Sequence, residues 1–305
     1  MAKLQPYHDD YYLWNYVPSM AAAVLFIILF IITTGLHTWR MFKNKSWFCT
    51  AFCIGGLFEI IGYIGRAIAV NSTGTLMPYV IQTIFTLIAP AFLAASIYMT
   101  LGRIMRYVHG EHHSIVRINW LTKIFVVADL LSFIVQSGAS GLMFSDSTAS
   151  LGQKVVLAGL IIQIIAFAFF LFTALVFERR MRREPTPESF VVEANWTHHL
   201  HCLYVISALI LVRSVFRVIE YAAGQKGYPL MHEWTLYTFD TVPMWIVTVI
   251  FLIWYPAQFQ VNPGARASPR ETVEEAQSVQ LMNSAEKKRS SRNPQTRVYG
   301  PRSMV

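Results

Sequence analysis

Charged residues are scarce in this chain of 305 residues. Asp, Glu, Lys and Arg together make up 14% of it, whereas an average soluble domain carries roughly 25%. Apolar residues make up 54%. So little charge cannot coat a water-soluble body of this size, which argues against a cytosolic enzyme, an extracellular module and a disordered chain.

Cysteine and catalytic motifs are also scarce. The chain has 3 cysteines, and all fall in the predicted cytoplasmic halves of spans, so we expect no disulfide. No Ser–His–Asp set, P-loop or paired-carboxylate hydrolase motif is present. His109, His112 and His113 lie in one predicted cytoplasmic loop, and His198, His199 and His201 flank the next inner interface; solvated side chains are a commoner explanation for them than a metal site. The sequence therefore predicts no enzyme activity, no metal and no cofactor.

Long apolar runs, in contrast, recur along the whole chain. Runs of about 20 apolar residues are typical of transmembrane helices, and barrel strands are only about 9–11 residues long. We predict an all-α integral membrane protein with a seven-transmembrane-helix bundle. The predicted domains are an extracellular head (1–16), a transmembrane domain (17–256) and a disordered basic cytoplasmic tail (257–305). The predicted spans are 17–38, 47–69, 79–101, 121–143, 152–177, 200–222 and 237–256.

Lys and Arg are distributed unequally between the two sides of this topology. The odd-numbered connections and the tail hold 18 of them, and the other side holds 3. By the positive-inside rule the N-terminus lies outside and the C-terminus in the cytoplasm. The net charge of +8 is thereby explained by topology, so we predict no nucleic-acid partner. The plasma membrane is the expected location.

Ionisable residues inside a membrane are costly, so each is a candidate functional residue. The acidic ones are Glu59, Asp129, Glu220 and Asp240, and the basic ones are Arg66, Lys123, Arg213 and Arg217; Gln82, Gln136 and Gln163 accompany them. Lys123 can extend to the inner interface and needs no special role. Asp129 alone among the acidic residues lies toward the cytoplasm.

Two interpretations of this set are open. One is a ligand or translocation cavity in the outer half of the bundle, because three charged helix faces and several glutamines converge at one depth. The other is an internal ion-pair network that fixes helix packing. We expect Glu59 to contact Arg66 or an arginine of the sixth span, since an unpaired charge at that depth costs at least about 2.5 kcal/mol.

Proline and glycine mark two further features of the spans. Pro90, in the middle of the third span, removes a backbone hydrogen bond and predicts a helix kink there. Pro243 predicts another in the seventh span. The glycines of the second span, which include Gly62 and Gly65, predict close approach of a neighbouring helix.

Several strings resemble a known family. Phe58-Glu59-Ile60-Ile61-Gly62-Tyr63-Ile64-Gly65-Arg66 resembles the second-span signature of the fungal RTA-like family, also called the lipid-translocating exporter family. The strings Ala89-Pro90-Ala91-Phe92 and Arg213-Ser214-Val215-Phe216-Arg217-Val218-Ile219-Glu220-Tyr221 resemble its third and sixth spans, and Asp240 its seventh. The resemblance covers about residues 15–264.

The resemblance implies a multi-pass membrane protein linked to release of sphingoid long-chain bases and to resistance against toxic amphiphiles. Other relatives are linked to sterol-analogue resistance and porphyrin handling. The implied partner is an amphipathic lipid or a small hydrophobic ligand. Whether such proteins translocate lipid themselves or regulate those that do stays open, and so does the oligomeric state. The alternative function is a seven-helix receptor or sensor, although the cytoplasmic end of the third span lacks the Asp/Glu-Arg-Tyr motif of such receptors.

Overall fold

The computed structural model describes residues 4, 6, 12–142, 149–186, 196–224 and 227–256. The predicted tail and most of the predicted head lie outside these residues, and so do parts of three predicted connections, 144–151, 178–199 and 223–236. All the described residues belong to one compact unit, Met1–Gln260.

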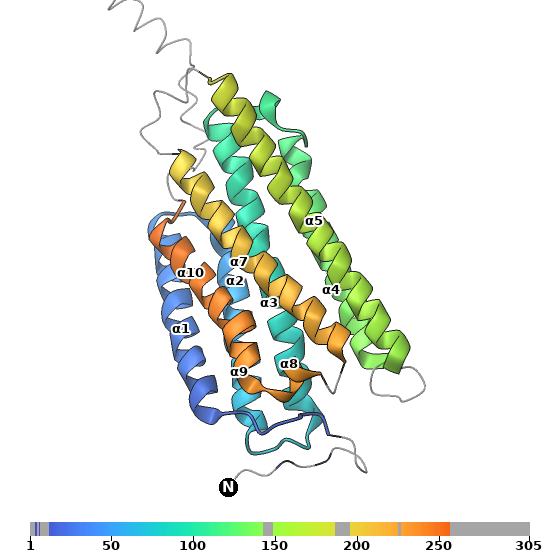
Figure 1. The fold of residues 1–305 in the computed structure, drawn as a ribbon. Coiled ribbons are helices and arrows are strands. Elements are labelled where there is room, and N and C mark those ends of the chain that lie inside the picture. Colours follow the sequence, from blue (N-terminus) through green and yellow to red (C-terminus); the bar gives the residue numbers. More distant parts are fainter. Residues whose placement is uncertain are drawn as a thin grey trace, which may run out of the picture. The chain divides into compact units, whose positions relative to one another are not determined.

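Seven helices long and apolar enough to cross a membrane make up this unit, and its described part contains no strand, which confirms the predicted fold class (Figure 1). The first six are α1 (Met20–Lys43), α2 (Thr50–Ala69), α3 (Leu76–Tyr107), α4 (Ile118–Leu142), α5 (Ala149–Arg183) and α7 (Trp196–Ala223). The seventh is assembled from α9 (Glu233–Leu236), a π-helical turn η3 (Tyr237–Thr241) and α10 (Val242–Ile253). Short elements are η1 (Trp47–Cys49), η2 (Glu111–His113) and α8 (Tyr228–Met231).

Three helices run five or six residues past their predicted ends. α1 ends at Lys43, α3 at Tyr107 and α5 at Arg183. The last turns of all three carry basic residues, which favourably oppose the negative end of the helix dipole. These helices therefore continue beyond the apolar runs from which the spans were predicted.

The helices form a closed ring around a central contact. From α1 to α5 each helix packs on the one that follows it in the chain. α5 then packs on α7, α7 on α10, and α10 on α1, which closes the ring. The central contact is the one between α3 and α7 (Figure 1). The N-terminal end of the bundle, defined here as the end where α1 begins and α2 finishes, also holds α8 and α9. This arrangement places side chains of α2, α3, α7 and the seventh helix opposite one another.

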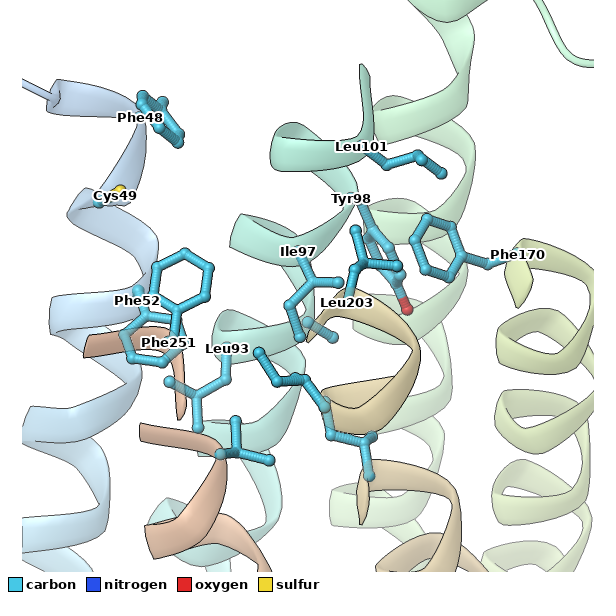
Figure 2. Packing of buried hydrophobic residues seen from close by; sticks show 14 of the residues in the cluster. Phe48, Cys49, Phe52, Leu93, Ile97, Tyr98, Leu101, Phe170, Leu203 and Phe251 are labelled. Atoms are coloured by element: carbon cyan, nitrogen blue, oxygen red, sulfur yellow. The ribbon is translucent and has the colours of Figure 1, made fainter. Parts of the chain in front are cut away.

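Aromatic and aliphatic side chains form an apolar core between the helices. Phe52 of α2 stacks on Phe251 of α10 with ring centroids 4.2 Å apart, and Tyr98 of α3 meets Phe170 of α5 edge-on at 4.6 Å. Leu203 of α7 lies among these groups (Figure 2). This apolar core fixes the helices that carry the polar groups at the N-terminal end.

Many large apolar side chains lie exposed on the outer surface of the bundle. Large side chains stay more than half exposed on several helices, such as Ile32 (53%), Leu131 (58%), Ile162 (58%) and Ile165 (63%). A surface of this kind suits contact with lipid tails and is unsuited to water. The molecule is therefore an integral multi-pass membrane protein.

The glycines of α2 allow α3 to approach closely, as predicted. A Cβ atom on Gly62 would lie 2.7 Å from Cγ2 of Thr86, and one on Gly65 would lie 2.9 Å from Cγ2 of Ile81. Neither position has room for a side chain. The contact between α2 and α3 therefore depends on these two glycines.

Candidate ligand cavity and ion-pair network

Two arginines of α7 share one carboxylate of the seventh helix. Arg217 binds Asp240 through two parallel hydrogen bonds, from Nε to Oδ1 (3.0 Å) and from Nη2 to Oδ2 (2.8 Å). Nε of Arg213 lies 2.7 Å from Oδ1 of the same Asp240. Nη1 of Arg217 also donates to Oε2 of Glu220 at 2.9 Å. We call these four buried residues, Arg213, Arg217, Glu220 and Asp240, the α7 network.

The π-helical turn explains how Asp240 reaches both arginines. In η3 the N–H of Val242 donates to the carbonyl of Tyr237, five residues back. Such a turn is wider than an α-helical turn and rotates the residues within it relative to the rest of the helix. Pro243, the predicted kink, follows directly and has no N–H to offer the turn before it.

Pro90 has a comparable effect on α3. Pro90 lies inside the helix and lacks the N–H that would bind the carbonyl of Thr86, four residues back. Nη2 of Arg213 donates to that carbonyl at 2.7 Å. A neighbouring helix thus satisfies the backbone group that the proline frees, as a membrane interior requires.

Arg66 of α2 forms a second centre. It is fully buried and its Nη2 donates to Oε1 of Glu233 at 2.7 Å and to the hydroxyl of Tyr16 at 3.0 Å. Its Nε donates to the hydroxyl of Tyr237 at 3.1 Å, and its Nη1 to Oε1 of Gln82 at 3.4 Å. Every nitrogen of the guanidinium therefore has a polar partner.

Aromatic rings surround the same guanidinium. The rings of Trp14, Tyr16 and Tyr237 lie with their centroids 5.5, 5.5 and 5.2 Å from Cζ of Arg66, within the range of cation–π attraction. Burial raises the pKa of Tyr16, although Arg66 acts to lower it. The Tyr16 hydroxyl therefore stays protonated at neutral pH.

Glu233 joins this centre to the start of the first helix. Its Oε1 and Oε2 accept from the backbone N–H of Ser19 at 2.8 and 3.1 Å, and Ser19 is the N-cap of α1. One carboxylate thus holds both Arg66 and the N-terminal segment in place.

A cavity of about 140 Å³ lies between the two centres. Arg66 of α2 and Gln82 of α3 line it together with Arg217 and Glu220 of α7. Other lining residues are Trp14, Tyr16, Thr86, Gln153, Tyr221 and Gly224. Gly224 ends α7 with φ +71°, a conformation that favours glycine, and it turns the chain along the cavity wall.

Glu59 does not pair as the sequence predicted. It is 2% exposed, and its Oε1 has no hydrogen-bond partner among the described residues. Arg66 binds Glu233 in its place, and within the described ranges Glu59 has no ion pair with an α7 arginine. The prediction was wrong because Glu59 and Arg66 share a helix face at spacing i, i+7, about two turns apart, which is too far for direct contact.

Asp129, Gln136 and Gln163 lie away from the cavity. Asp129 of α4 accepts a hydrogen bond from the Tyr98 hydroxyl at 2.8 Å. Gln136 of α4 donates to Gln163 of α5 at 3.3 Å. These contacts tie α4 to α3 and to α5. None of the three residues lines the cavity described above.

Lys123 borders a separate, apolar groove. This groove of about 510 Å³ lies between α3 and α4, and its walls include Ala91, Phe92 and Val126. The Lys123 side chain is exposed and its Nζ lies 5.8 Å from the ring centroid of Trp120.

Sequence reasoning missed Glu233, Tyr16 and Tyr237, which hold Arg66. Glu233 lies in the loop before the predicted seventh span (237–256), and no sequence pattern marks the two tyrosines as partners of a charge. The spacing of seven residues between Glu233 and Asp240 places both on one face of a helix, and this could have indicated that the seventh helix begins before residue 237. His37 was also missed; its Nε2 lies 2.9 Å from the carbonyl of Thr248 and connects α1 to α10.

The fold and the buried charges define a class: a seven-helix integral membrane protein with paired charges and a small cavity at one end of its bundle. Comparison with known families agrees. The model of the family described as "RTA1 like protein" matches residues 52–262. The chain belongs to this family, which confirms the resemblance found in the sequence.

Several curated yeast proteins are similar to this chain. "Protoporphyrin uptake protein 1" of Saccharomyces cerevisiae is 30% identical over 280 residues, covering 80% of this chain and 92% of the relative. "Protein RTA1" of the same species is 32% identical over 273 residues, covering 81% and 86%. "Sphingoid long-chain base transporter RSB1" is 26% identical over 276 residues, covering 79% and 72%. No solved structure matches.

Proposed function

We propose that this protein translocates amphipathic, lipid-like molecules with a cationic head group across the membrane, and that the cavity receives the head group. The observation that carries the proposal is the cavity itself. It places Glu220, Arg217, Arg66 and Gln82 around an open volume inside the bundle. A purely structural network would need no such volume.

The size of the cavity favours a head group over a whole lipid. Pockets that enclose a drug-sized ligand measure about 300–1,000 Å³, and this one measures about 140 Å³. An ammonium or hydroxyl group fits this space, and the apolar tail stays outside it. Glu220 would attract the ammonium, and Arg66 and Gln82 would offer donors to hydroxyl groups.

The names of the relatives support a ligand of this class. One is a sphingoid long-chain base transporter, and such a base combines an amine with a single long tail. Another is a protoporphyrin uptake protein, so ligand chemistry varies within the family.

We also propose that the N-terminal end of the bundle faces outward and that the protein resides in the plasma membrane. The unequal distribution of Lys and Arg supports this orientation. The cavity then opens toward the outer leaflet, where an exported amphiphile would be released.

Reconstitution tests the proposal. The purified full-length protein in liposomes should accelerate movement of a fluorescent sphingoid base between leaflets, and Glu220→Gln should slow it several-fold. Glu178→Gln is the matched control, because Glu178 pairs with Arg182 at the opposite end of the bundle and should leave the rate unchanged.

The same assay separates a transporter from a receptor or sensor. A receptor would show no flip activity in pure liposomes, and its cellular phenotype would vanish when its downstream effector is deleted. Absence of accelerated flip with folded protein would reject the proposed transport.

A further inference from the structure

Glu59 differs from the other carboxylates near the cavity, because it is buried without a cation bound to it. Its side chain is 2% exposed and Oε1 has no hydrogen-bond partner in the part of the chain that the structure describes. By contrast, Asp240 and Glu220 bind guanidinium groups at 2.7–3.0 Å.

The charged and titratable groups that face Glu59 come from three elements. Arg213 and Arg217 attract it from α7, Asp240 repels it from η3, and Tyr63 lies one turn away on α2. The Tyr63 hydroxyl is engaged with Oγ1 of Thr241 at 2.5 Å.

A count of charges shows that Glu59 is in surplus. The α7 network contains two guanidinium groups and two carboxylates, so it is neutral without Glu59. An ionised Glu59 would add an uncompensated negative charge to a site removed from water, which a buried group avoids by binding a proton. With a monovalent cation in the cavity the count changes to three positive and three negative charges.

We propose that Glu59 holds a proton while the cavity is empty and releases it when a cationic head group binds, so that one proton is exchanged for one cation. The step is a simple proton transfer to water: the carboxylic acid becomes a carboxylate, and the ligand ammonium keeps its own protons. This inference rests on the proposed function, and it assigns the cation–proton exchange to one side chain.

Arg213 relates Glu59 to the cavity: its charge attracts Glu59 without a direct ion pair, and its guanidinium reaches the cavity wall. Nη2 of Arg213 binds the carbonyl of Thr86, and Thr86 lines the cavity. Arg213 also touches Asp240, and Asp240 shares Arg217 with Glu220 at the cavity wall. A cation beside Glu220 therefore competes with Arg217 for that carboxylate and adds one positive charge to the site. An ionised Glu59, which attracts Arg213, balances that added charge.

Binding measurements on the full-length protein in nanodiscs test the exchange. The probe is a fluorescent long-chain primary amine, which stays charged below about pH 8 because an alkyl ammonium titrates near 10.4. We expect about one proton released per amine bound in weakly buffered solution. Affinity should rise about tenfold per pH unit over the range in which Glu59 titrates, because binding and proton release are linked.

Glu59→Gln sharpens the test, since glutamine resembles the protonated acid and should preserve folding. We expect this variant to bind the amine more weakly, to release no proton and to show no pH dependence. Glu178→Gln, at the opposite end of the bundle, should keep the wild-type slope. If the Glu59→Gln variant fails to fold, the wild-type measurement still decides whether binding releases a proton at all, and a count of zero overturns the inference.

The outcomes separate this inference from the proposed function. Amine binding and flip that proceed with no proton release and no pH dependence would overturn the role of Glu59 and leave transport standing. Protein that neither binds nor flips the amine would overturn both. Proton release that persists in Glu59→Gln would assign the exchange to another group and overturn the inference.

Discussion

Arg213 of α7 binds the one backbone carbonyl that Pro90 leaves free on α3. The acceptor is the oxygen of Thr86, 2.7 Å from Nη2 of Arg213, and the same arginine lies 2.7 Å from Asp240. A proline in the third helix thus helps to position an arginine of the sixth and an aspartate of the seventh.

Pro90→Ala should lower transport without unfolding the protein. Alanine restores the N–H that binds the Thr86 carbonyl within α3, so Arg213 has to share that acceptor and its hydrogen bond weakens. We expect the melting temperature to stay equal or rise, because alanine favours helix, and the flip rate to fall several-fold. Pro78→Ala, in the first turn of the same helix where no N–H is needed, is the control. A wild-type flip rate in Pro90→Ala would contradict the role assigned to the proline.

Asp240→Asn should destabilise the protein more than Glu220→Gln. Asp240 neutralises two buried arginines, whereas Glu220 binds one, and removal of one partner of a buried pair costs about 3–5 kcal/mol. Thermal unfolding of the purified variants measures the difference. Equal melting temperatures for the two variants would show that Asp240 is not the centre of the α7 network.

The Arg66–Glu233 pair should be strongly coupled. A double-mutant cycle of Arg66→Gln and Glu233→Gln should give an interaction energy within the range of about 0.5–3 kcal/mol found for contacting residues, and toward its upper end because Arg66 is fully buried. The pair Arg182–Glu178, whose arginine is 57% exposed, should give only about 0.3–0.5 kcal/mol. If both cycles give the same energy, burial does not strengthen the Arg66 pair.

Gly62→Ala should disrupt the contact between α2 and α3. The added Cβ would lie 2.7 Å from Thr86, and Thr86 carries the carbonyl that holds Arg213. We expect less folded protein, measured as the monodisperse fraction after extraction in detergent. Gly35→Ala, with nothing within 4 Å of its Cβ position, should be neutral or slightly stabilising. A Gly62→Ala protein as well folded as the control would show that the helices can separate at little cost.

The orientation of the chain has a direct test. A reporter or protease site at residue 290 should be on the cytoplasmic side, and one fused to the N-terminus should be outside, because Lys and Arg crowd the connections of one side. Access to residue 290 from outside intact cells would reverse the topology and place the cavity on the inner face.

The sequence alone determined the seven helices. An apolar run of about 20 residues in lipid has to satisfy its backbone internally, so it becomes a helix wherever it lies in the chain. The same rule identified Arg66, Arg213, Arg217, Glu220 and Asp240 as the residues that need an explanation, since each interrupts such a run. Pro90 and Gly62 were also recognisable, because their backbone properties depend on residue type alone.

Only the tertiary structure decided which of these residues meet. The helical period places Glu59 and Arg66 on one face, but it does not say which neighbour that face contacts, and Arg66 binds Glu233, 167 residues away. The π-helical turn at Tyr237–Thr241 rotates Asp240 to a position that a regular helix would not give it. Asp129 shares its residue type with Asp240 but faces Tyr98 across another interface. Partners are set by helix rotation and by the order of helices around the ring, and both follow from packing over the whole bundle, which no local stretch of sequence contains.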